Sequence, residues 1–142
     1  METKIQKAVL GGIVATAVMT MIIFMAPLMG IPKMNPAEML AGKLGGEIII
    51  GWVMHFMIGV IFALVYVFLF SELIRKINSK VLKGALFGLS VFVFAQIMMV
   101  LMNFVTGGNE SPAGNMFLIL LGSVMGHINY GIVVALFLPN RA

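Results

Sequence analysis

Long apolar stretches alternate with short polar connections along the whole chain. Four stretches contain no Lys, Arg, Asp or Glu, and they cover residues 8–32, 48–70, 84–105 and 116–139. Each is long enough to cross ~30 Å of hydrocarbon at about 1.5 Å per helical residue. The stretches show no period of two, and helices satisfy their own backbone hydrogen bonds in lipid. The pattern therefore predicts an all-α polytopic membrane protein with four transmembrane helices.

Proline, glycine and asparagine mark the ends of these stretches. Pro27 predicts a kink near the end of the first one, because proline removes a helical hydrogen bond. Asn35 followed by proline is typical of a helix start, which predicts a short interfacial helix over residues 36–41. Ser111 and Pro112 give a similar start signal before the fourth stretch.

Composition supports a lipid environment and removes several kinds of chemistry. The 142 residues are 61% hydrophobic and only 10% charged, whereas soluble domains carry about 25% charged residues. So few charges exclude a soluble globular domain, and the length fits one transmembrane domain over residues 1–142. There is no cysteine, which excludes disulfides, thiolate metal sites and thiol nucleophiles. The small net charge of +4 gives no reason to expect a nucleic-acid partner.

The few basic residues predict the orientation of the chain. Two lie on one side of the expected spans, Lys33 and Lys43, and seven lie on the other: Lys4, Lys7, Arg75, Lys76, Lys80, Lys83 and Arg141. Loops rich in lysine and arginine stay in the cytoplasm. Both termini are therefore expected to be cytoplasmic.

The two halves of the chain resemble each other at an offset of 72 residues. Of 70 aligned pairs, 12 are identical, and the matches cluster at corresponding places in the predicted helices. They include His55 with His127 and Gly59 with Gly131. The pattern predicts two tandem helical hairpins, over about residues 1–70 and 71–142, that form one four-helix bundle with a pseudo-twofold axis along the membrane normal.

His55 and His127 are ionisable side chains within spans that hold no carboxylate, lysine or arginine. Ionisable residues inside a membrane are rare and point to function. Three interpretations compete for this pair. Each imidazole could form a structural hydrogen bond across helices, or the two could be axial ligands of a b-type haem between the hairpins. The third group of interpretations comprises a metal site, a quinone site and a proton relay.

The methionines are a second group of candidate ligands, after the two histidines, because the chain contains 14 of them. Thioethers are soft ligands for Cu(I), and Met25 and Met29 form an i, i+4 pair in the first stretch. Methionine is also a flexible apolar filler of membrane helices, and this simpler interpretation is the favoured one.

Short motifs along the chain support the predicted class of protein. They are the run from Gly12 to Thr16 with Met19 and Thr20, the turn with Pro27, Gly30 and Pro32, the run from Gly51 to His55 with Tyr66, and Gly126 and His127 with Tyr130 and Gly131. Together these residues resemble an uncharacterised family of small four-helix integral membrane proteins of prokaryotes. The resemblance implies the four-helix fold and a location in the cytoplasmic (inner) membrane, and it brings no known activity.

The sequence thus predicts an integral membrane protein without catalytic machinery of its own. No nucleophile or acid-base pair of an enzyme is evident. We expect an accessory subunit or assembly factor of a larger membrane complex, such as a respiratory one, whose partners are the lipid bilayer and other membrane subunits or a second copy. The alternative is a haem-b electron carrier that uses His55 and His127. A small transporter and a copper-handling protein are less favoured.

Overall fold

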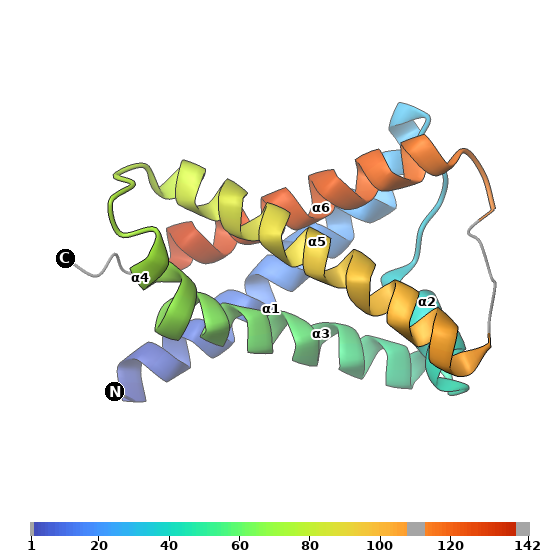
Figure 1. Ribbon diagram of the computed structural model, residues 1–142, viewed down its shortest axis with the longest axis horizontal. Coiled ribbons are helices and arrows are strands. Elements are labelled where there is room, and N and C mark those ends of the chain that lie inside the picture. Colours follow the sequence, from blue (N-terminus) through green and yellow to red (C-terminus); the bar gives the residue numbers. More distant parts are fainter. Residues whose placement is uncertain (1, 108–112, 139–142) are drawn as a thin grey trace.

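The protein is helical throughout the part that the computed structural model describes, residues 2–107 and 113–138 (Figure 1). No strand occurs in these residues. The α-helices are α1 (Glu2–Met25), α2 (Pro36–Leu44), α3 (Ile48–Val65), α4 (Ser71–Leu73), α5 (Lys80–Thr106) and α6 (Met116–Phe137). Two other helical segments are the 3₁₀-helix η1 (Ala26–Met29) and the π-helix η2 (Tyr66–Phe70). The predicted all-α fold is confirmed.

Four helical segments in the described residues are long and apolar enough to cross a membrane. They are Thr3–Met29, Ile48–Leu73, Lys80–Thr106 and Met116–Phe137, and they correspond to the four predicted stretches. In the second segment, η2 joins α3 directly to α4. Figure 1 shows that α1 begins and α6 ends at the same end of the bundle.

Helix boundaries differ from the prediction in two places. The expected kink at Pro27 is a 3₁₀ turn, η1, which ends at Gly30 with a φ of 80°. Helix α2 begins as predicted, with the Asn35 side chain accepting a hydrogen bond from the Ala37 amide at 3.1 Å, but it extends past residue 41. It ends at Leu44 and is capped by Gly45, where a φ of 64° in the left-handed region favours glycine. The start signal at Ser111 and Pro112 lies outside the described residues.

Glycines bring the helix backbones of each hairpin into direct contact. A Cβ at Gly12 of α1 would lie 2.8 Å from the Cα of Val60 and 3.0 Å from the carbonyl oxygen of Gly59, both in α3. A Cβ at Gly84 of α5 would overlap the Cα of Ile132 and lie 2.6 Å from the carbonyl oxygen of Gly131, both in α6. The three residues of the second crossing each lie 72 positions after their counterparts in the first. This correspondence agrees with the proposed internal repeat, which stays a prediction.

The bundle is closed at one end and open at the other. Figure 1 shows α5 and α6 close together near the start of α5 and diverging toward its end. At the closed end, the rings of Phe87, Tyr66 and Phe70 pack together, with ring centroids of Phe87 4.9 Å from those of the other two. At the open end, α2 lies against α3 and also contacts α5 (Figure 1).

We expect Gly84→Ala to destabilise the protein, because the new methyl group meets backbone atoms of α6 that cannot rotate away. Overpacking of this kind costs about 1–3 kcal/mol. The free energy of unfolding, measured by titration with a denaturing detergent in mixed micelles, reports the change. Gly42→Ala in α2 is the matched control, because no atom lies within 4 Å of its added Cβ. Equal stability of the two variants would contradict the proposed close contact.

Candidate functional site

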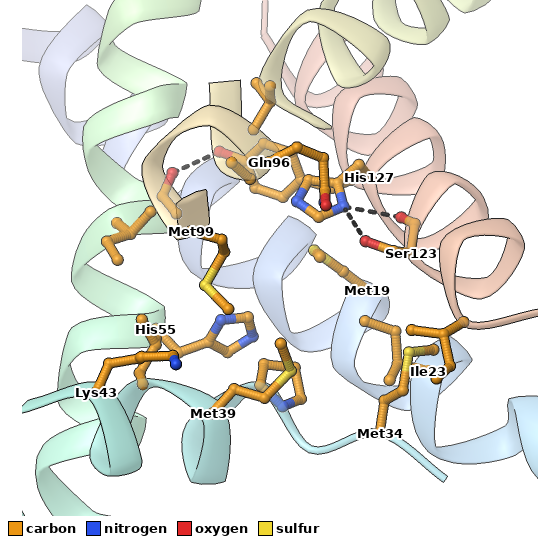
Figure 2. Close-up of a pocket in the computed structure, with 18 of the residues that line it drawn as sticks. Met19, Ile23, Met34, Met39, Lys43, His55, Gln96, Met99, Ser123 and His127 are labelled. Atoms are coloured by element: carbon orange, nitrogen blue, oxygen red, sulfur yellow. Dashed lines mark hydrogen bonds between the residues drawn. The ribbon is translucent and has the colours of Figure 1, made fainter. Parts of the chain in front are cut away.

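A cavity of about 570 Å³ lies between the diverging helices. Its wall is formed by residues of α1, α2, α3, α5 and α6, together with Met34 from the connection between η1 and α2. Most of the lining side chains are apolar. Both histidines of the chain line this cavity, with His55 extending from α3 and His127 from α6 (Figure 2).

His55 is buried and forms a hydrogen bond with a neighbouring helix. Its Nε2 atom lies 3.0 Å from the Thr20 hydroxyl of α1. That hydroxyl donates its own hydrogen to the carbonyl oxygen of Thr16 at 2.7 Å, so it accepts from His55. We therefore assign the ring proton of His55 to Nε2. The Trp52 ring packs edge-on against the imidazole, with centroids 6.1 Å apart.

His127 forms its hydrogen bond within its own helix. Its Nδ1 atom lies 2.8 Å from the carbonyl oxygen of Ser123, which can only accept. We therefore assign the ring proton of His127 to Nδ1. The Ser123 hydroxyl is more distant, 3.5 Å from the same nitrogen. The Phe92 ring packs edge-on against this imidazole, with centroids 5.7 Å apart.

Each neutral imidazole thus keeps one nitrogen with an unused lone pair. These atoms are Nδ1 of His55 and Nε2 of His127, and neither has a hydrogen-bond partner among the residues described. Both atoms are accessible, because Asn103 Oδ1 is the only fully buried side-chain oxygen or nitrogen without a partner in the described chain. The lone pairs are therefore available to a ligand in the cavity.

Tyr130 of α6 connects the two hairpins across the closed end of the cavity. Its hydroxyl donates to the carbonyl oxygen of Gly59 at 2.5 Å. A Cβ at Gly59 would overlap the Thr16 hydroxyl of α1, so glycine is required where α1, α3 and α6 meet. The Thr16 hydroxyl in turn donates to the carbonyl oxygen of Gly12 at 2.7 Å. Both hydroxyl hydrogens at this end of the cavity are thus already used.

The methionines separate into two groups. Five of them line the cavity: Met19, Met34, Met39, Met99 and Met116. The predicted copper pair does not. Met25 is 58% exposed at the end of α1 and Met29 is 70% exposed at the end of η1, so the two belong to different helical segments. Copper binding by this pair stays a prediction.

Helix α5 contributes further side chains to the site. Gln96, Met99 and Asn103 line the cavity, and the Asn103 side-chain oxygen is buried without a partner. A spacing of seven residues places Gln96 and Asn103 on one helix face. This spacing is the sequence feature from which their shared position could have been predicted. Glu38 and Lys43 of α2 also line the cavity. Their position could not be deduced, because it depends on how α2 folds over the open end.

The cross-helix bonds predicted for the histidines are found for one of them. Thr20 does bind His55, whereas His127 bonds to the backbone of its own helix. Two other polar side chains of the spans also bond within their own helices: Ser90 donates to the carbonyl oxygen of Leu86 and Asn129 to that of Met125.

The fold and the site define a small four-helix membrane protein with an apolar cavity that contains two neutral histidines. The chain belongs to the family of unknown function DUF6789, whose model matches residues 2–140. The comparison with curated proteins and the comparison with solved structures found no match. Membership confirms the resemblance to an uncharacterised family.

We predict that the two imidazoles carry their protons on different nitrogens, Nε2 in His55 and Nδ1 in His127. Nitrogen-15 NMR of histidine-labelled protein distinguishes a protonated ring nitrogen from one with a lone pair. Thr20→Val should change the His55 signals and leave those of His127 unchanged, because it removes the Nε2 acceptor. It should also cost about 1 kcal/mol of unfolding free energy.

Thr106→Val is the control for this experiment. Its hydroxyl is exposed and donates to the carbonyl oxygen of Met102 in its own helix. The same protonated nitrogen in both histidines of the unmodified protein would contradict the assignment.

Proposed function

We propose that the protein is a non-catalytic accessory subunit or assembly factor of a larger membrane complex, such as a respiratory one. We place it in the cytoplasmic (inner) membrane of a prokaryote with both termini in the cytoplasm. The distribution of basic residues supports this orientation. The location rests on the resemblance to small prokaryotic membrane proteins.

The uncovered surface of α5 is the observation that carries the proposal. Only 17% of the most apolar stretch of α5 is buried inside the described part of the protein. The corresponding share for the first span, Thr3–Met29, is 44%. Ile97, Leu101 and Phe104 are 54%, 51% and 88% exposed, and their spacing places them on one face of the helix. The long helix α5 therefore offers an apolar face on which helices of another subunit can pack.

The chemistry of the cavity supports a role without catalysis. Ser123 and His127 are neighbours, as in a nucleophile and base pair. However, the His127 nitrogen nearest to the hydroxyl carries a proton and donates it to the Ser123 carbonyl oxygen. It cannot accept the hydroxyl proton in this arrangement, so the pair lacks the geometry that activates a serine.

We expect a photoreactive amino acid at position 97 or 101 to form covalent adducts with other membrane proteins in native membranes. Both positions lie on the exposed face of α5. The same substitution at Met21 of α1, which is 64% exposed, is the matched control and should yield mainly lipid adducts. Gel shifts and mass spectrometry identify the products.

Two results of this experiment would contradict the proposal. Adducts with a second copy of the chain alone would indicate a homo-oligomer. Lipid adducts alone, together with a 15.4 kDa monomer in lipid nanodiscs, would indicate a protein that works without partners.

Haem-b binding is the second candidate, and one observation favours it: both histidines line a single cavity. His127 fits as an axial ligand, since its Nε2 lone pair is unused. His55 fits less well, because its Nε2 is bonded to Thr20. Its free Nδ1 lies next to the carbon that joins the ring to the backbone, where a flat macrocycle would collide with the chain. Haem binding would thus require the Nε2 atom of His55 to break its hydrogen bond with Thr20 and to bind the iron instead.

The visible absorption spectrum tests the haem candidate. If haem binds, protein produced with an adequate haem supply should show a Soret band, and His127→Ala should abolish or shift it. Ser90→Ala is the control, because its hydroxyl is exposed and bonds only within α5. A spectrum without a Soret band would eliminate this candidate and leave the accessory role unaffected.

A further inference from the structure

The cavity combines a large apolar volume with a few polar side chains, and two of them, His55 and His127, carry free lone pairs. We propose that it binds an uncharged aromatic molecule with hydroxyl donors, of the hydroquinone (quinol) class. The inference concerns the cavity alone, so it goes beyond the accessory role and does not depend on a partner complex. It uses the histidine protonation states as they stand, without the rearrangement that haem requires.

The size and lining of the cavity favour an organic ligand. Sites for small organic molecules are typically about 300–1,000 Å³, apolar, and supplied with a few well-placed polar groups. The cavity volume of about 570 Å³ lies within this range. Its wall includes the Phe62 ring, the thioethers of the five methionines, and aliphatic side chains such as Val91 and Ile119. Such a wall suits a substituted ring.

The polar atoms that have no partner define what the ligand must carry. Nδ1 of His55 and Nε2 of His127 both present lone pairs, so both are acceptors. Lys43 and the side-chain amides of Gln96 and Asn103, which also line the cavity, carry N–H donors. The hydroxyls of Thr16 and Tyr130 have donated their hydrogens to backbone carbonyls, so they offer only further lone pairs. A ligand with hydroxyl groups, which both donate and accept, would pair with the histidine nitrogens and with these N–H donors.

The rim of the cavity favours a ligand dissolved in the membrane. Side chains that line the cavity and are also exposed mark its opening. Apart from Glu38 and Gly42 of α2, they are apolar: Met39, Val100, Met116 and Leu120. An opening with these side chains admits an apolar molecule from lipid with little loss of hydration.

The two histidine nitrogens predict which oxidation state binds more tightly. A hydroquinone presents O–H donors, whereas the corresponding quinone presents only carbonyl acceptors. Opposite the lone pairs of His55 and His127, the quinone would leave acceptors facing acceptors. A site that hydrogen-bonds a hydroxyl discriminates against an analogue without it, because its own polar groups stay unpaired. The reduced form should therefore bind more tightly.

A ligand pair tests the inference directly. Trimethylhydroquinone and its dimethyl ether have the same ring, but the ether has no donor. Trp52 is the only tryptophan of the chain and packs against His55, so its fluorescence reports on the cavity. Anaerobic titration of haem-free protein in nanodiscs should give a saturable change with the hydroquinone. The ether should bind at least about tenfold more weakly.

Variants locate the binding within the protein. His127→Phe removes an acceptor, keeps an aromatic ring, and should weaken hydroquinone binding at least about tenfold. Ser90→Ala, outside the cavity, should leave the dissociation constant unchanged. Equal binding of the two ligands, an unchanged constant in His127→Phe, or no saturable change would overturn the inference. The ligand comparison needs no variant, so it remains decisive if His127→Phe does not fold. A Soret band in the purified protein would also overturn it, because haem would occupy the same volume.

Discussion

Contact between helix backbones at glycine is the interaction on which the rest of the structure depends. In lipid, apolar side chains gain little by leaving one apolar environment for another, so helices associate through close packing and hydrogen bonds. Gly12 against Gly59 and Gly84 against Gly131 provide this closeness, one crossing in each hairpin. A methyl group at Gly12 or Gly84 would meet the backbone of the partner helix. The fold therefore rests on the absence of side chains at a few positions.

These crossings also determine where the helices separate. Gly84 and Gly88 lie near the start of α5, and a Cβ at Gly88 would overlap the backbone of His127. Helices that meet closely at one end and cross at an angle must diverge toward the other. The divergence opens the cavity, and it places His127 at the last close contact. On the other wall, His55 lies one helical turn before Gly59. The glycines at the helix crossings are thus neighbours of the histidines that line the cavity.

Hydrogen bonding inside the bundle explains why the two histidines of the cavity carry free lone pairs. In the absence of water, Thr16, Thr20 and Tyr130 donate to backbone carbonyl oxygens, and the imidazoles donate to Thr20 and to the Ser123 carbonyl. A neutral imidazole has one ring hydrogen, so its use in these bonds leaves the other ring nitrogen with a free lone pair. The free lone pairs of the two histidines are therefore a consequence of how the bundle satisfies its own polar groups.

The sequence alone determined the class of protein, the four membrane-crossing helices and the two histidines, because these follow from composition and local pattern. Uncharged stretches are visible in the linear sequence. A histidine within such a stretch is easily recognised, because it is an ionisable residue among apolar ones. The tertiary structure decided which nitrogen of each histidine is free, that five methionines other than Met25 and Met29 line the cavity, and that Asn103 joins the site. These features depend on crossing angles and on the position of α2 over the open end. They arise from contacts between residues far apart in the chain, and no local pattern encodes such contacts.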